Sequence, residues 1–101
     1  MENIGHFVNG TRSPGESGNF ADVFNPATGE VQAKVSLANK TEFEKIVNSA
    51  RKAQPAWAAT NPQRRARVLM KFVDLLHRDM DKLAEKLSSE HGKTLPDAKG
   101  D

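Results

Sequence analysis

The sequence predicts a mixed α and β fold, in which an antiparallel β-ribbon is followed by two long helices and the start of a third. Apolar and polar residues alternate with a period of two up to about residue 37. From Thr41 onward the apolar residues recur three or four positions apart, which is the spacing of an amphipathic helix. Turn-forming residues separate these segments, so the elements are distinct.

The predicted ribbon covers about residues 6–37. Residues 6–9 read as a short strand that ends in a glycine- and serine-rich loop over residues 10–19. Residues 20–24 alternate in the same way, and the apolar positions of the next strand are Val31, Ala33, Val35 and Leu37. Between these strands, Asn25 precedes a proline and is kept out of the helical region, while Gly29 can adopt a positive φ. The pattern indicates a hairpin with one buried face.

The first helix is predicted over about residues 41–59. Thr41 and Glu44 have the spacing of a capping box, in which each side chain accepts the other residue's backbone N–H. The apolar stripe that follows contains Phe43, Ile46, Val47, Ala50, Ala53 and Trp57. Pro55 lies within this stripe, and we expect it to kink the helix or to end its regular part near Gln54.

The second helix is predicted over about residues 62–91. Asn61 is its expected cap, Pro62 suits the first helical position, and Gly92 should end it. Its apolar stripe contains Leu69, Phe72, Val73, Leu76, Met80, Leu83, Ala84 and Leu87. A helix of this length spans roughly 43 Å, whereas a compact domain of this size has a radius of gyration of only ~13 Å. Something outside this chain is therefore expected to cover the stripe.

A third helix is predicted to begin at about residue 95. Thr94 is its expected cap, Pro96 lies in its first turn, and Asp97 lies near its positive end. The sequence then stops at Asp101, before a helix of independent stability could form. We therefore expect the chain to be part of a larger domain.

The composition excludes several classes of protein. The net charge is only +2, with acidic and basic residues interspersed, which is too weak to indicate nucleic acid or an anionic membrane. No cysteine is present, which rules out disulfides and thiolate chemistry within these residues. The N-terminus does not resemble a secretory signal, and no apolar run approaches the ~20 residues of a membrane span. A cytoplasmic protein is expected.

No catalytic, cofactor-binding or metal-binding residue is predicted from local patterns. The glycines do not have the spacing that cradles a dinucleotide or a phosphate. His77 and His91 would lie ~21 Å apart along one helix and could not share an ion. The carboxylates lie beside lysines or arginines at helical spacing, which is typical of a solvated, charged helix face.

One cluster of charged residues is not typical of a solvated helix surface. It consists of Arg64, Arg65 and Arg67 at the predicted N-terminus of the second helix, where cations oppose the helix dipole. Two interpretations stay open. The arginines could contact nucleic acid as part of a small helical interaction module, or they could form ion pairs between domains or subunits. The cluster is small and has no interleaved aromatic residues, which favours the second interpretation.

Five phrases, in this order, resemble the N-terminal segment of the aldehyde dehydrogenase superfamily. They are FVNG, NPATGEV, ARKAQPAWAA, QRRARVLMKFVDLL and LAEKLSSEHGKTLPDAKGD, and together they cover nearly the whole chain. The ending HGKTLPDAKGD is most similar to the CoA-acylating methylmalonate-semialdehyde dehydrogenases.

The resemblance implies that residues 1–101 are the first, incomplete part of a three-layer α/β domain that binds NAD. The full-length enzyme would convert a semialdehyde, NAD and coenzyme A into acyl-CoA, CO2 and NADH. Its catalytic cysteine and nicotinamide-binding glycines would follow Asp101, so the chain alone is expected to bind no cofactor and to catalyse no reaction. The implied partners are the remainder of the cofactor domain and the other subunits of a homo-oligomer, with no membrane involved.

Two further expectations come from the resemblance alone. Several family members hold a monovalent cation with a backbone carbonyl and a carboxylate at positions that correspond here to Phe24 and Asp101. The ribbon and both helices pack on the outside of the cofactor domain in the family. The apolar stripe from Leu69 to Leu87 would then face the core of that domain.

Overall fold

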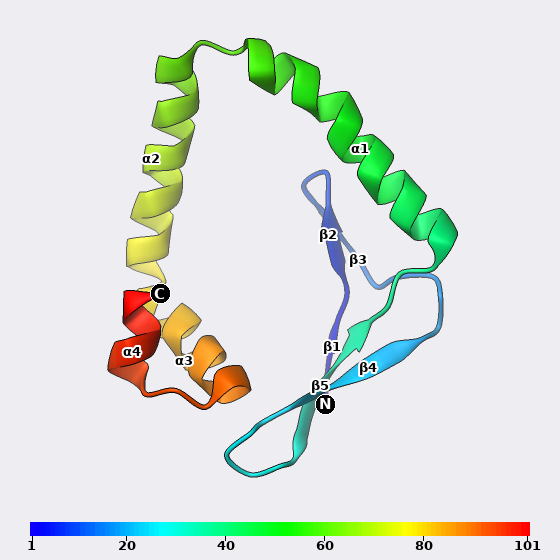
Figure 1. Ribbon diagram of the computed structural model, residues 1–101, viewed down its shortest axis with the longest axis vertical. Coiled ribbons are helices and arrows are strands. Elements are labelled where there is room, and N and C mark those ends of the chain that lie inside the picture. Colours follow the sequence, from blue (N-terminus) through cyan, green and yellow to red (C-terminus); the bar gives the residue numbers. More distant parts are fainter. The chain divides into compact units, whose positions relative to one another are not determined.

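The computed structural model describes residues 1–101 and confirms the mixed α and β class, with strands first and helices after them (Figure 1). The elements are β1 (Glu2–Ile4), β2 (His6–Val8), β3 (Thr11–Ser13), β4 (Phe20–Phe24), β5 (Val31–Ser36), α1 (Lys40–Ala59), α2 (Pro62–Arg78), α3 (Met80–His91) and α4 (Leu95–Gly100). The first of two compact units contains Met1–Phe24 and Val31–Ala59, and the second contains Asn25–Glu30 and Thr60–Asp101.

The first unit holds a three-stranded sheet in the order β1-β5-β4. The predicted antiparallel hairpin is confirmed, since β4 pairs with β5 in that sense and Ala21 lies opposite Val35. Both strand pairings within the predicted ribbon of residues 6–37 are antiparallel. Strand β1, which precedes this range and was not predicted, adds to the other edge of β5 in parallel. Of the predicted inward positions, Ala33 is buried, but Leu37 is 46% exposed because it lies beyond the end of β5.

Residues 11–13, expected within a loop, instead form a strand that pairs with β2. The two strands are joined by Asn9 and Gly10, which have φ values of 50° and 75°. Two consecutive residues with positive φ form the type of turn that matches the natural twist of a hairpin, and Asn-Gly is its preferred sequence. This dipeptide is the signal that could have revealed the hairpin.

The N-terminus of α1 carries a capping box, but two residues earlier than predicted. The Glu42 N–H donates to Asn39 Oδ1 at 2.8 Å, and the Asn39 N–H donates to Glu42 Oε2 at 3.1 Å. The assignment to Thr41 and Glu44 is therefore wrong. Asparagine is as favourable as threonine at the N-cap of a helix. In the observed capping box, the glutamate partner Glu42 is buried.

Helix α1 continues through Pro55 to Ala59, which confirms the first helix predicted over about residues 41–59. Of the two effects expected from Pro55, an end of the regular helix near Gln54 is wrong, and a kink stays a prediction. Proline removes one backbone donor, and the helical turns on both sides keep their own hydrogen bonds. Asn61 then begins α2 as predicted, with its Oδ1 accepting the Gln63 N–H at 2.8 Å.

The predicted helix over residues 62–91 is two helices that meet at Asp79. The backbone there has φ −103° and ψ 13°, outside the helical region, and α3 turns away from α2 (Figure 1). The expectation of one long rod with a continuous apolar stripe is therefore wrong. No proline or glycine marks the break, so the local sequence carried no signal of it. The predicted end at Gly92 is confirmed by its left-handed φ of 91°.

Helices α3 and α4 pack together in the second unit. Ala84 and Ala98 are buried, and the Lys99 Nζ lies 2.9 Å from an Asp81 carboxylate oxygen. Helix α4 begins after Thr94, as predicted, but the Thr94 side chain makes no capping hydrogen bond. The only buried apolar residues of the chain are three alanines, so its own core is small.

Candidate functional site

The most distinctive surface is the apolar face of α2, which we define as Leu69, Phe72, Val73 and Leu76. These residues recur at spacings of three and four and therefore lie along one side of the helix. Leu69 is 56% exposed and Phe72 is 55% exposed, and no large side chain of the chain is fully buried. Exposed apolar surface of this kind marks a contact with another polypeptide or a membrane.

The opposite side of α2 carries Arg64, Arg67 and Lys71. Arg64 and Arg67 are exposed, whereas Arg65 is half-buried and its Nε has no hydrogen-bond partner. None of the three arginines forms an ion pair within the structure. A helix with one apolar face and one basic face can bury the first while the second stays hydrated.

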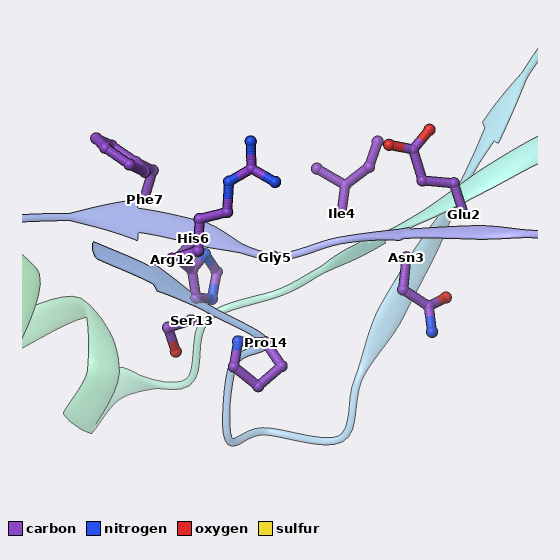
Figure 2. A pocket seen from close by; sticks show the side chains of 9 residues that line it. All are labelled: Glu2, Asn3, Ile4, Gly5, His6, Phe7, Arg12, Ser13 and Pro14. Atoms are coloured by element: carbon purple, nitrogen blue, oxygen red, sulfur yellow. The ribbon is translucent and has the colours of Figure 1, made fainter. Parts of the chain in front are cut away.

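The first unit also has a hollow of about 410 Å³ along β1, β2 and β3 (Figure 2). Glu2, Ile4, Phe7 and Arg12 project on one side of these strands, and Asn3, His6, Ser13 and Pro14 project on the other. His6 and Ser13 are paired across the hairpin, but the Ser13 Oγ accepts the Gly15 N–H at 3.2 Å. The His6 Nε2 has no hydrogen-bond partner, so no serine–histidine hydrogen bond exists here.

The structure groups no three His, Cys, Asp or Glu side chains in a way that could hold a metal ion. The residues considered for a monovalent cation belong to different units. The Phe24 carbonyl accepts a hydrogen bond from Gln32 Nε2 at 3.3 Å, and the Asp101 carboxylate pairs with the Lys93 ammonium. This cation site stays a prediction.

The junction between α2 and α3 carries an ion pair between neighbouring residues. Arg78 donates to the Asp79 carboxylate from Nε at 3.2 Å and from Nη2 at 2.8 Å. These hydrogen bonds lower the pKa of Asp79 and raise the pKa of Arg78. The pair is exposed, so its effect on stability is small.

The lowered pKa of Asp79 makes the folding stability depend on pH, and the direction of this dependence follows from the direction of the shift. The stability that the carboxylate contributes is present above its unfolded-state pKa of about 3.9 and is lost as the pH falls through the lower, folded-state value. We expect the NMR signal of the Arg78 Nε–H, which donates to the Asp79 carboxylate, to shift on acidification below about pH 4 as that carboxylate is protonated. In an Asp79→Asn variant this acid shift should be absent. An equal shift in the variant would contradict the assignment.

The model of the family described as "Aldehyde dehydrogenase family" matches residues 13–101. The chain belongs to the aldehyde dehydrogenase family. This finding confirms the resemblance on which the sequence-based expectations rested.

Relatives within the aldehyde dehydrogenase family include dehydrogenases of malonate semialdehyde and of methylmalonate semialdehyde. The chain is 44% identical over 101 residues to a malonate-semialdehyde dehydrogenase from Pseudomonas aeruginosa, covering all of this chain and 20% of that protein. It is 42% identical over 98 residues to a mitochondrial acylating methylmalonate-semialdehyde dehydrogenase from Arabidopsis thaliana, covering 97% of this chain and 16% of the relative. The chain therefore spans about a fifth or less of the length of these relatives.

Solved structures of aldehyde dehydrogenases share the fold. A protein from Sinorhizobium meliloti, described as a methylmalonate-semialdehyde dehydrogenase complexed with NAD, is 60% identical with a TM-score of 0.93 over 99% of this chain and 20% of that one. A methylmalonate-semialdehyde dehydrogenase from Oceanimonas doudoroffii is 39% identical with a TM-score of 0.92, at the same coverage. None of the helices in this aldehyde dehydrogenase chain is long and apolar enough to cross a membrane.

Proposed function

We propose that the chain is the N-terminal scaffold segment of an NAD-dependent, CoA-acylating dehydrogenase of methylmalonate or malonate semialdehyde. The names of its relatives support this choice of substrate, and the NAD complex of the Sinorhizobium protein supports the cofactor. The full-length enzyme would oxidise the semialdehyde with NAD and transfer the acyl group to coenzyme A, with release of CO2. The cytoplasmic location stays a prediction, since several relatives are named as mitochondrial.

The observation that carries the scaffold role is the exposed apolar face of α2. Its four large apolar side chains are 38–56% exposed, and covering them would add part of the about 1.5–3 kcal/mol that full burial of each such side chain contributes. The remainder of the cofactor domain is the partner that we propose to cover this face. Residues 1–101 would then form the first part of an NAD-binding domain within a homo-oligomer.

The chain's own residues do not fit the role of a dinucleotide site. The glycines with positive φ lie in turns and loops among the strands or at the end of a helix: Gly10, Gly15, Gly18, Gly29 and Gly92. None opens a helix directly after a strand, where backbone N–H groups could cradle a pyrophosphate. We therefore propose that NAD and coenzyme A bind outside these residues.

The alternative of a nucleic-acid-binding module is not supported by the relatives reported above, which are all named as dehydrogenases. Arg65 fits a contact between domains or subunits better, because it is half-buried on the side of α2 that carries the apolar face and its Nε has no hydrogen-bond partner. The scaffold proposal therefore also explains Arg65, whereas Arg64 and Arg67 lie on the opposite side of α2.

A chimera tests the scaffold role. We expect the chain alone to produce no NADH from methylmalonate semialdehyde, NAD and coenzyme A. Replacing the corresponding first fifth of the Sinorhizobium protein by this chain should keep that protein's activity. A Phe72→Asp substitution in the chimera should abolish soluble, active enzyme, because it would place a charge in the buried contact. Lys71→Asp, on the opposite face of α2, is the matched control and should keep most of the activity.

Two results would overturn the proposal. One is turnover by the 101-residue chain alone. The other is a chimera in which Phe72→Asp and Lys71→Asp have equal, small effects on soluble yield and activity, since α2 would then have no buried face in the enzyme.

A further inference from the structure

The turn between β2 and β3 has an unusual combination of sequence and exposure. Asn9 is followed directly by Gly10, and both residues are exposed. A Cβ placed on Gly10 would meet no atom within 4 Å, so the side-chain position of this residue faces open space. The Asn9 side chain makes no hydrogen bond in the structure, whereas the Oδ1 of Asn25, Asn39 and Asn61 each accept one.

These features suit a known reaction of the asparagine side chain. The following residue's backbone nitrogen can attack the asparagine Cγ, and the absence of a Cβ on glycine leaves that approach unhindered. The N–Cγ bond forms, the nitrogen loses its proton to solvent, and the side-chain amide leaves as ammonia. The resulting five-membered succinimide then adds one water molecule and opens to an aspartyl or an isoaspartyl residue. No oxidant, enzyme or cofactor is required.

We propose that Asn9 is a site of spontaneous deamidation in the folded chain. The hairpin that presents it consists of two strands of three residues each and belongs to no larger sheet. An isolated two-stranded hairpin is only marginally stable, so local opening lets the Asn9 backbone rotate into the reactive geometry.

The other asparagines lack one or more of these features. Asn25 and Asn61 precede prolines, which have no N–H to lose. Asn39 is held in the capping box, and Asn48 lies within α1, where the helix fixes the backbone. Asn3 and Asn19 precede Ile4 and Phe20, whose side chains hinder the attack. Asn3 and Asn19 therefore serve as internal references for the rate of deamidation at Asn9.

The product would change the first unit. An isoaspartyl residue adds a carbon atom to the backbone of a two-residue turn, which is incompatible with the pairing of Val8 and Thr11. Either product replaces a neutral amide with a carboxylate, so the net charge of the chain decreases by one. Formation of the isoaspartyl product at Asn9 would therefore open the hairpin that lines the hollow of Figure 2.

The test is a time course of the full 101-residue chain in mildly alkaline buffer prepared with ¹⁸O-labelled water, followed by peptide mapping. We expect the Asn9 peptide to accumulate a labelled product with an isoaspartyl isomer, several-fold faster than the Asn3 and Asn19 peptides. Gly10→Ala should slow the reaction several-fold, and Asn9→Gln should abolish it.

A parallel sample in denaturant distinguishes the folded chain from the unfolded one. Measurable deamidation of Asn9 in buffer supports the proposal. Reaction only in denaturant, or a rate in buffer no faster than at Asn3 and Asn19, would overturn it. This comparison uses the unmodified sequence, so it holds even if Gly10→Ala disturbs the hairpin.

Discussion

Replacing Gly5 by alanine is expected to destabilise the first unit by about 2–3 kcal/mol, because the structure has no room for a side chain there. Gly5 joins β1 to β2, and the backbone of β3 passes directly beside it. A Cβ at this position would lie 2.1 Å from the Ser13 carbonyl oxygen and 3.1 Å from Pro14 Cα. Both contacts are with backbone atoms, so no side-chain rotation can relieve them.

The effect of Gly5→Ala can be measured by amide hydrogen exchange in the β2–β3 hairpin. We expect the hairpin amides to exchange faster and the pairing of His6 with Ser13 to be lost. Gly100→Ala is the matched control, because a Cβ there meets no atom within 4 Å. If the two variants exchange at the same rate, the close approach at Gly5 is not a structural constraint.

Replacing Glu42 by alanine should have the second large effect, because the Glu42 carboxylate connects two parts of the first unit. Its Oε1 accepts the Glu16 N–H at 2.6 Å, and its Oε2 accepts the Asn39 N–H at 3.1 Å. Glu42 is only 7% exposed, and its loss would remove the acceptor of two partly buried backbone N–H groups. Hydrogen bonds to a charged group contribute about 1.5–3 kcal/mol each.

We expect the Glu42→Ala variant to show amide exchange at Glu16 and Asn39 that is faster by about ten- to a hundredfold, as a loss of 1.4–3 kcal/mol implies. Glu42→Gln should have a smaller effect, because its amide oxygen can still accept one of the two N–H groups. Glu44→Ala is the matched control, as Glu44 is exposed and takes no part in the observed cap. If Glu44→Ala proved as damaging as Glu42→Ala, the cap would be at Thr41 instead.

The two possible capping boxes show how precisely a local sequence pattern can predict the start of a helix. Asn39 with Glu42, and Thr41 with Glu44, both have the required residue types at the required spacing. The sequence analysis placed the cap at Thr41, two residues after the observed cap, and the spacing alone does not distinguish the two positions. The Glu16 backbone N–H, 26 positions away in the chain, distinguishes them because it binds Glu42.

The apolar face of α2 was predicted from the sequence in part. The helical spacing of Leu69, Phe72, Val73 and Leu76 indicated an apolar stripe, and the structure confirms that this face of α2 is exposed. The length of the stripe was overestimated, because α2 ends at Arg78 and α3 takes another direction. The hollow along β1 to β3 was not predicted, since it depends on the parallel addition of β1 and on the β2–β3 hairpin.

Sequence reasoning alone predicted that strands precede helices, and it predicted the β4–β5 hairpin, the start of α2 at Asn61 and Pro62, and the end of α3 at Gly92. Each of these depends on hydrogen bonds or dihedral preferences among residues a few positions apart, and the residue types record them directly. Three features became known only from the folded structure: the parallel pairing of β1, the capping box at Asn39 and Glu42, and the break at Asp79. The first two depend on groups that are distant in sequence and meet only on folding, and the third carries no residue that breaks a helix on its own.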